Sequence, residues 1–238
     1  MSDPRERLII ALDVSSAAAA QTIVAAVGES GFFYKVGKQL FTAEGPLVVR
    51  DLVASGKRVF LDLKYHDIPN TVGAAVAEAA KLGVKMVTVH VSGGGKMLQA
   101  AVTAANASLN RPTILGVTVL TSLNDHDLDT IGIRGGVTSE VLRLGALAIT
   151  SGCGGLVASA REASELRKEL GHNFAVVTPG VRPAGAGHGD QVRVVTPSEA
   201  IASGATHIVV GRPITEAPDP SEETRAILAE MESVGVAH

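Results

Sequence analysis

The chain has 238 residues, a formal net charge of −3 and hydrophobic side chains at 46% of its positions. This length suits one large α/β domain with a well-buried core, so we expect residues 1–238 to form one domain. The balanced charge and an aromatic content of only 3% argue against a nucleic-acid-binding protein, which needs a basic face or aromatic stacking platforms.

Targeting and redox signals are sparse. Cys153 is the only cysteine, so no intramolecular disulfide can form and a reducing compartment fits. The segment 3–12 is too acidic at its start, and its apolar run too short, for a signal peptide. No apolar run approaches the roughly 20 residues of a membrane helix. We therefore expect a cytoplasmic protein that does not contact membranes.

Short apolar, β-branched runs recur along the whole chain, and helical patterns fit between them. The predicted strands are Arg7–Asp13, Phe32–Val36, Val59–Lys64, Met86–His90, Thr113–Leu120, Gly155–Ala158, Ala175–Thr178 and His207–Val210. The predicted helices are Ala17–Gly28, Thr71–Leu82, Met97–Ala107, Ser139–Ser151, Glu162–Leu170, Pro197–Ala202 and Ser221–Ser233, with a weaker pattern at Pro46–Ala54. Alternation of this kind implies parallel strands with right-handed crossovers. Eight units favour a single (β/α)8 TIM barrel over the alternative, a doubly wound open sheet.

In a (β/α)8 barrel, catalytic groups gather at the C-terminal ends of the strands, and phosphate binds after strands 7 and 8. The polar residues of this chain follow that pattern. Those at or just after predicted strand ends are Asp13, Lys35, Lys38, Asp62, Lys64, His90, Thr121, Ser122, Arg182, Gly211 and Arg212. We expect them to share one mouth of the barrel.

The segment from Val59 to Pro69 carries the strongest functional signal. Side chains alternate across a strand, so Asp62 and Lys64 should point to the same side, with Asp67 following where the strand ends. Desolvating such a charge cluster is costly and adds little stability, which suggests chemistry rather than a surface ion-pair patch. Nearby carboxylates favour the ammonium form, so Lys64 is predicted to act as an acid and not as a Schiff-base nucleophile.

Other charged groups allow more than one interpretation. Lys35 could pair with Asp13 or reach toward Asp62, whereas Lys38 is expected to be a solvated rim residue. His66 and His90 could join the aspartates as metal ligands, but a lysine in the cluster repels a cation, so we expect no metal.

Two glycine-containing segments are candidates for binding a ligand. A glycine-rich loop at 184–191 could be a lid, in which Gln191 reaches the ligand, or an ordinary flexible loop. Gly211 and Arg212, directly after the last strand, suit phosphate, because a glycine lets backbone N–H groups approach and an arginine binds it bidentately.

Over nearly its whole length the chain resembles the orotidine 5'-phosphate decarboxylase family. The most specific match is the D-x-K-x-x-D signature with its continuation, Asp62-Leu63-Lys64-Tyr65-His66-Asp67-Ile68-Pro69-Asn70-Thr71. Supporting matches are Ala11-Leu12-Asp13, Lys35-Val36-Gly37, Val119-Leu120-Thr121-Ser122, Pro179-Gly180-Val181-Arg182-Pro183, Gly189-Asp190-Gln191 and Gly211-Arg212-Pro213. The resemblance implies a carboxy-lyase without a cofactor that converts orotidine 5'-phosphate to UMP and carbon dioxide, the last step of UMP synthesis.

The resemblance also implies a role for each residue. Lys64 would protonate C6 of the pyrimidine, Asp62 would sit beside the substrate carboxylate, and Lys35 would anchor a Lys35–Asp62–Lys64–Asp67 network. Asp13 and Lys35 would bind the ribose hydroxyls. Thr121 or Ser122 would meet the base, with Asn124 left open as a third candidate. Arg182, Gln191, Gly211 and Arg212 would hold the phosphate. Asp67 and Thr71 would reach into the partner's site, which implies a homodimer with shared active sites.

Two alternative functions remain open from the sequence. A Mg²⁺-dependent sugar-phosphate decarboxylase or hexulose-phosphate synthase shares D-x-K-x-x-D, although the Ile-Pro-Asn-Thr continuation and the Gly-Asp-Gln segment argue against it. A non-catalytic nucleotide-binding barrel would have no reason to keep a charged Lys64 in its pocket.

Overall fold

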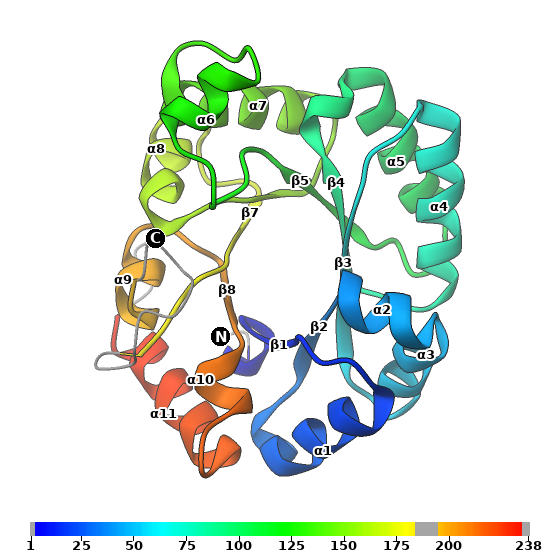
Figure 1. Ribbon diagram of the computed structural model, residues 1–238, viewed down its shortest axis with the longest axis vertical. Helices are drawn as coiled ribbons and strands as arrows, with labels where there is room; N and C mark the ends of the chain where they lie inside the picture. The colour runs from blue at the N-terminus through cyan, green and yellow to red at the C-terminus, as the bar shows by residue number, and fades with distance from the viewer. Residues whose placement is uncertain (1–2, 184–194, 235–238) are drawn as a thin grey trace.

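A closed barrel of eight parallel strands forms the centre of the computed structural model, which describes residues 3–183 and 195–234 (Figure 1). The strands follow one another in chain order, and β1 closes the ring by pairing with β8. Their bounds are β1 Leu8–Leu12, β2 Phe33–Gly37, β3 Arg58–Tyr65, β4 Met86–His90, β5 Thr113–Val117, β6 Gly155–Val157, β7 Ala175–Thr178 and β8 His207–Val210. The predicted (β/α)8 barrel is confirmed.

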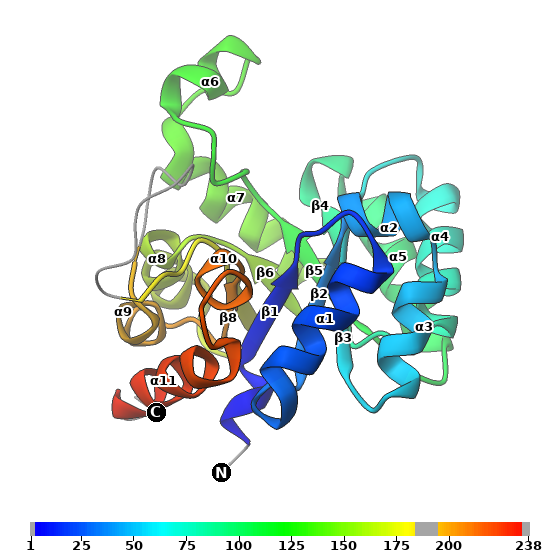
Figure 2. The same cartoon turned by 60° about the horizontal axis from the view of Figure 1, so that its bottom comes forward.

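Helices surround the barrel (Figures 1 and 2). Their bounds are α1 Ala17–Val27, α2 Lys38–Glu44, α3 Leu47–Ala54, α4 Pro69–Lys81, α5 Gly95–Ala107, α6 Asp125–Thr130, α7 Gly136–Thr150, α8 Ala160–Leu170, α9 Pro197–Ala202, α10 Arg212–Thr215 and α11 Pro220–Ser233, with 3₁₀ turns η1 Pro4–Glu6, η2 Gly28–Ser30 and η3 Val91–Gly93. Capping residues set several of the starts: the side chains of Ser16, Ser159, Thr196 and Asp219 each accept a backbone N–H from the first turn.

All eight predicted strands and all of the predicted helices are present, but three short helices were missed. The helices α2, α6 and α10 have only seven, six and four residues and lack a clear periodic apolar pattern, whereas the equally short α9 was predicted. The fifth strand was also predicted too long, because it ends at Val117 and not at Leu120. Residues 118–124 form a loop that leads into α6, which stands away from the barrel in Figure 2.

Side chains alternate between two apolar layers along each strand. One buried cluster fills the barrel interior and consists of Ile9, Ala11, Phe33, Phe60, Met86, Leu115, Val177 and Val209. The residues between them, such as Ile10, Tyr34 and Val176, belong to the larger cluster that packs against the helices. The interior cluster closes the barrel below its C-terminal end, so a ligand can enter from that end only as far as these side chains.

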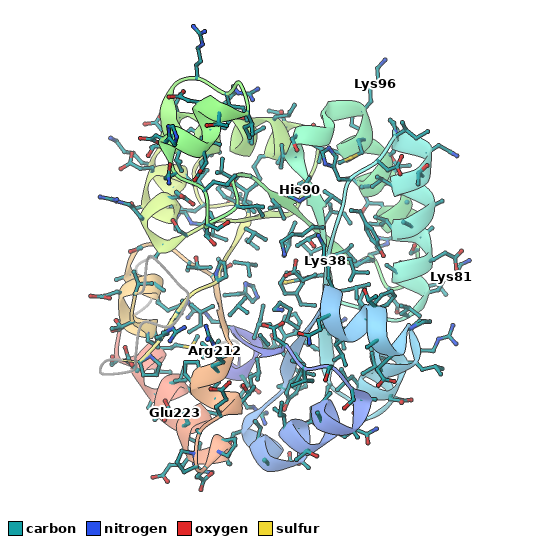
Figure 3. All side chains as sticks on the ribbon, viewed as in Figure 1. Lys38, Lys81, His90, Lys96, Arg212 and Glu223 are labelled. Atoms are coloured by element: carbon teal, nitrogen blue, oxygen red, sulfur yellow. The ribbon has the colours of Figure 1, made fainter. Side chains whose placement is uncertain are left out.

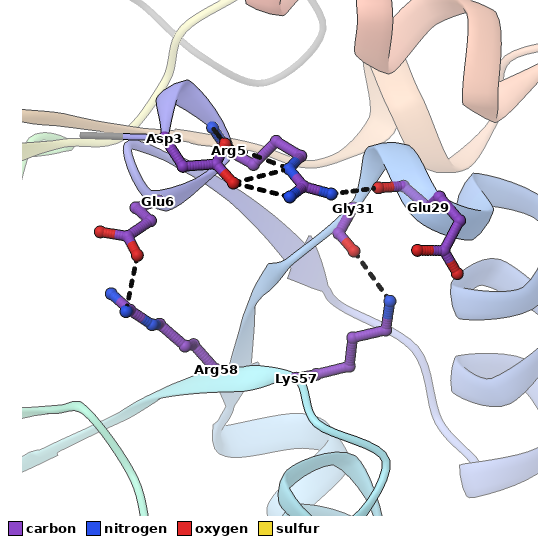
Figure 4. A network of polar contacts seen from close by, with 7 residues as sticks. All are labelled: Asp3, Arg5, Glu6, Glu29, Gly31, Lys57 and Arg58. Carbon is purple, nitrogen blue, oxygen red and sulfur yellow. Dashed lines mark hydrogen bonds and ion pairs between the residues drawn. The ribbon is translucent and has the colours of Figure 1, made fainter. Parts of the chain in front are cut away.

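At the N-terminal ends of the strands, opposite the C-terminal mouth, ion pairs and hydrogen bonds connect several segments of the chain (Figure 4). Arg58 at the start of β3 pairs with Glu6 at 2.6 Å, and Arg5 pairs with Asp3 and donates to the Glu29 carbonyl. These contacts link the segment before β1 to β3 and η2. Among the described helices, none is long and apolar enough to cross a membrane.

Candidate active site

Two adjoining cavities occupy the C-terminal mouth of the barrel. The larger, about 470 Å³, lies between the ends of β1, β7 and β8 and the start of α10. The smaller, about 170 Å³, lies over β3, β5 and β6. Both are lined by Lys35, Pro179 and Val209, so they form one continuous site. Figure 3 shows His90 and Lys38 on one side of the barrel opening and Arg212 on the other.

Lys64 and Asp62 form the central ion pair of the smaller cavity. The Lys64 Nζ atom lies 2.8 Å from each Asp62 carboxylate oxygen, and both side chains are mostly shielded from water. The rest of this cavity is largely apolar, with Phe60, Val117 and Val177 among its walls. Water screens such a pair poorly, so its charges act strongly on any ligand placed beside them.

The backbone of Lys64 does not follow the simple strand alternation that was expected. The pairing of β3 with β4 runs from Leu61 opposite Val87 to Tyr65 opposite Val89, so the three residues from 62 to 64 face Thr88 alone. This is a bulge, and within it Lys64 adopts a φ of +53°, in the left-handed region that residues other than glycine rarely enter. The predicted position of Lys64 beside Asp62 is correct, but a bulge produces it.

Lys35 connects the two cavities and pairs with Asp13. Its Nζ atom lies 2.7 Å from Asp13 Oδ1, while the Lys35 side chain is buried and that of Asp13 is exposed. Of the two partners that the sequence left open, the structure selects Asp13. Gly37 packs against this pair, since a Cβ atom at that position would lie 3.1 Å from Lys35 Nζ and 3.3 Å from Asp13 Oδ1.

The remaining predicted ligand-binding residues divide into two groups. Arg182, which is buried, lines the larger cavity together with Gly211 and Arg212. Thr121 lines the smaller cavity, whereas Ser122 is exposed and lines neither. The third candidate for the base, Asn124, instead caps α6. Gln191 lies outside the described residues.

Asp67 and Thr71 line neither cavity of the chain to which they belong. Both are exposed, and Asp67 Oδ1 accepts the backbone N–H of Ile68 at 2.6 Å. Ile68 is 67% exposed, although it is a large apolar residue. This corner after β3 therefore presents a carboxylate and an apolar side chain to the exterior.

The two histidines near the mouth lie against each other, with ring centroids 5.4 Å apart. Burial lowers the pKa of His90, and the nearby His66, Lys38 and Lys64 lower it further. A neutral His90 adds no positive charge beside Lys64. No group of three His, Cys, Asp or Glu side chains within residues 3–183 and 195–234 is arranged to hold a metal ion.

Thr88 is a site residue that the sequence analysis missed. It is fully buried on β4, and its hydroxyl contacts both Asp62 Oδ1 at 3.0 Å and the Lys64 backbone nitrogen at 2.9 Å. A usable signal was present, because Thr88 lies two positions before His90 and so shares its face of the strand. Threonine is common in strands, which made it inconspicuous.

The two cavities differ in chemical character. The smaller one offers an ammonium group that can give up a proton, next to a carboxylate and in apolar surroundings. The larger one carries Arg182, Arg212 and Lys35, whose positive charges suit a phosphate, and Asp13, which can accept hydrogen bonds from hydroxyls. Together they suit a ligand with an anionic group such as a phosphate at one end and a group that can accept a proton at the other.

Comparison with known proteins agrees with this geometry. The family model described as "Orotidine 5'-phosphate decarboxylase / HUMPS family" matches residues 6–227. Proteins named orotidine 5'-phosphate decarboxylase are similar over nearly the full length: that of Halorhodospira halophila is 50% identical over 96% of this chain and 97% of its own, and that of Moorella thermoacetica is 49% identical over 97% and 94%. A crystal structure of orotidine 5'-phosphate decarboxylase from Lactobacillus acidophilus superimposes with a TM-score of 0.85 at 38% identity, covering 94% of this chain and 98% of the other.

Proposed function

Because this chain belongs to the orotidine 5'-phosphate decarboxylase / HUMPS family, we propose that it converts orotidine 5'-phosphate to UMP and carbon dioxide, the last step of de novo pyrimidine synthesis. The observation that carries the proposal is the Lys64 ammonium, held by both oxygens of Asp62 in an apolar cavity that adjoins a basic one. We infer a cytoplasmic location from the single buried cysteine.

Lys64 supplies the proton in this mechanism. The bond between C6 and the carboxylate carbon breaks, carbon dioxide leaves, and the electron pair stays on C6. A proton from Lys64 Nζ then forms the new C6–H bond, and solvent later returns a proton to the amine. The carbanion has no adjacent carbonyl group to delocalise its charge, so a preorganised ammonium in a water-poor site stabilises it electrostatically. Asp62 lies beside the substrate carboxylate and favours its departure, a secondary contribution.

The larger cavity binds the part of the substrate that does not react. Asp13 and Lys35 bind the ribose hydroxyls, while Arg182, Arg212 and Gly211 hold the phosphate together with Gln191. Thr121 or Ser122 contacts the base, and the cavity lining favours Thr121. Binding energy from these remote contacts positions C6 against Lys64 and so lowers the barrier.

A turnover assay with a chelator tests this function against its nearest alternative. Protein incubated with orotidine 5'-phosphate and EDTA should form UMP at the same rate as without EDTA, because the proposed chemistry needs no metal. A Mg²⁺-dependent sugar-phosphate decarboxylase or hexulose-phosphate synthase would lose activity with EDTA on its own substrate. Absence of UMP formation in both conditions would rule out the proposed function.

We further propose a homodimer in which each subunit completes the other's site. Asp67 and Thr71 are exposed and lie outside their own chain's cavities, which is the placement expected of residues that serve a partner. The exposed Ile68 between them supplies apolar surface for such an interface. Asp67 of one subunit would then join the Asp62–Lys64 pair of the other, beside the Lys35–Asp13 pair.

Subunit mixing tests the shared site. Lys64→Ala and Asp67→Ala homodimers should each be inactive, and their mixture should recover activity, because each heterodimer contains one site with both residues intact. Subunit exchange is monitored with differently tagged chains, and a mixture of Lys64→Ala with Lys64→Arg serves as the matched control. Exchange without recovered activity would show that Asp67 acts within its own chain.

A further inference from the structure

We infer that Thr88 is a positioning residue that orients the proton donor and its carboxylate partner through one hydroxyl group. The inference rests on the proposed function, since it assigns Thr88 a part in the chemistry of Lys64 and Asp62. Thr88 has no exposed surface and lines neither cavity, so it acts through these two residues and not on the substrate.

The hydrogen bonds of Thr88 determine where its proton lies. The Lys64 backbone N–H donates to Thr88 Oγ1 at 2.9 Å, which uses the oxygen as an acceptor. The hydroxyl has one proton of its own, and it donates this proton to Asp62 Oδ1 at 3.0 Å. The same Asp62 oxygen also accepts from Lys64 Nζ at 2.8 Å. The hydroxyl therefore closes a ring of hydrogen bonds that holds the backbone of Lys64, its side chain and Asp62 in one arrangement.

The bulge in β3 explains why a side chain is needed at this point. In a regular parallel ladder, alternate residues of β3 would donate their N–H groups to backbone carbonyls of β4. Here the register passes from Val87 directly to Val89, and the Thr88 hydroxyl accepts the N–H of Lys64 in place of a backbone carbonyl. Lys64 also holds a φ of +53°, which is unfavourable for a residue with a Cβ atom and persists only where the surroundings enforce it. The hydrogen bond from the Lys64 N–H to Thr88 Oγ1 is one of the contacts that hold this backbone conformation.

Removing the hydroxyl should therefore impair catalysis more than binding. Thr88→Val keeps the shape of the side chain but leaves the Lys64 N–H without its acceptor and Asp62 without one donor. Hydrogen bonds to charged groups are among the stronger ones, so we expect kcat to fall by about 10- to 100-fold. The affinity for UMP should change little, because Thr88 lines neither cavity and cannot touch the ligand. Thr88→Ser restores the hydroxyl and should retain most of the wild-type kcat.

A matched control separates this effect from general damage to the core. Thr224 on α11 is also fully buried, and its hydroxyl donates to the Pro220 carbonyl far from the mouth. Thr224→Val makes the same isosteric change and should leave kcat unaltered. If Thr88→Val does not fold, Thr88→Ser and Thr88→Ala provide the comparison, since they differ by the hydroxyl alone.

The outcomes distinguish the inference from the function on which it rests. A wild-type protein that does not form UMP would contradict the proposed function, whatever the variants do. With an active wild-type protein, equal kcat values in the Val and wild-type forms, or in the Ala and Ser forms, would overturn the role of Thr88. An equal loss of kcat and of UMP affinity would also overturn it, because it would show a general structural defect. A selective loss of kcat that serine rescues would support it.

Discussion

The Nζ atom of Lys64 lies 2.8 Å from both carboxylate oxygens of Asp62, and the two side chains sit within a single bulge of β3. An ion pair exposed at a surface is held weakly, because ordering two long side chains costs entropy. Here the bulge, the apolar cavity and Thr88 hold them before a ligand arrives. Preorganised charge of this kind stabilises a transition state without reorganisation during the reaction.

The first prediction concerns Lys64 itself. Lys64→Ala should lower kcat by at least about 10³-fold, since the variant lacks both the proton donor and the cation that stabilises the carbanion. The expected measurement is UMP formation from orotidine 5'-phosphate, with circular dichroism to verify folding. Lys81→Ala, at an exposed ion pair on α4, is the control and should keep full activity. An active Lys64→Ala enzyme would exclude Lys64 as the acid.

A second prediction tests the pair of Lys35 and Asp13 without changing either residue. Gly37 has an ordinary φ of −95°, so alanine is tolerated by the backbone, but its methyl group would press on both partners of the pair. We expect kcat/KM to fall about tenfold through displaced ribose contacts, with little loss of stability. Gly73→Ala on α4 is the control, because its Cβ would meet only ordinary contacts. Unchanged kcat/KM in Gly37→Ala would show that the exact position of this pair is unimportant.

A third prediction concerns the phosphate. Arg182→Ala should weaken UMP binding by about 10- to 100-fold, the range expected for a lost charge-assisted hydrogen bond. Uridine lacks the phosphate, so its binding should not change. Isothermal titration with both ligands measures the difference, with Arg225→Ala on the exposed side of α11 as control. A parallel loss of uridine binding would place Arg182 elsewhere in the ligand site.

The fourth prediction is a loss of stability in acid that depends on His207. Burial, with help from Arg7 and Arg58, lowers the pKa of His207 from 6.5 to about 4. Between these values the unfolded chain binds a proton that the folded chain does not, so the contribution of His207 lowers stability as the pH falls from 6.5 to 4 and is constant below that. The loss amounts to about 3 kcal/mol.

Urea unfolding at several pH values measures this dependence. His207→Gln should flatten the curve between pH 6.5 and 4, whereas the control His126→Gln, at an exposed position on α6, should leave it unaltered. A wild-type stability that is constant over this interval would show that His207 becomes protonated in the folded state as readily as in the unfolded one.

The sequence was sufficient for the architecture because the signals involved are local and repeated. Runs such as Met86–His90 and Ala175–Thr178 are apolar and β-branched, and their bounds agree with the structure. The helix α10 escaped prediction because it has only four residues and begins directly in the turn after β8, whereas α9, with its capping threonine and proline, was predicted. The true end of β5 at Val117 depends on its neighbours, because a strand continues only while β4 and β6 offer partners.

By itself, the sequence determined which charged residues reach the mouth of the barrel, because Asp62, Lys64 and Arg182 lie at or just after the C-terminal ends of predicted strands. The tertiary structure alone decided how they meet. In the structure Lys35 pairs with Asp13, and Asp67 lies outside its own cavity. The Thr88 hydroxyl accepts the Lys64 backbone N–H. These contacts depend on the register between strands and on a single bulge. Residues distant in sequence determine the register and the bulge, so a local sequence pattern does not predict either.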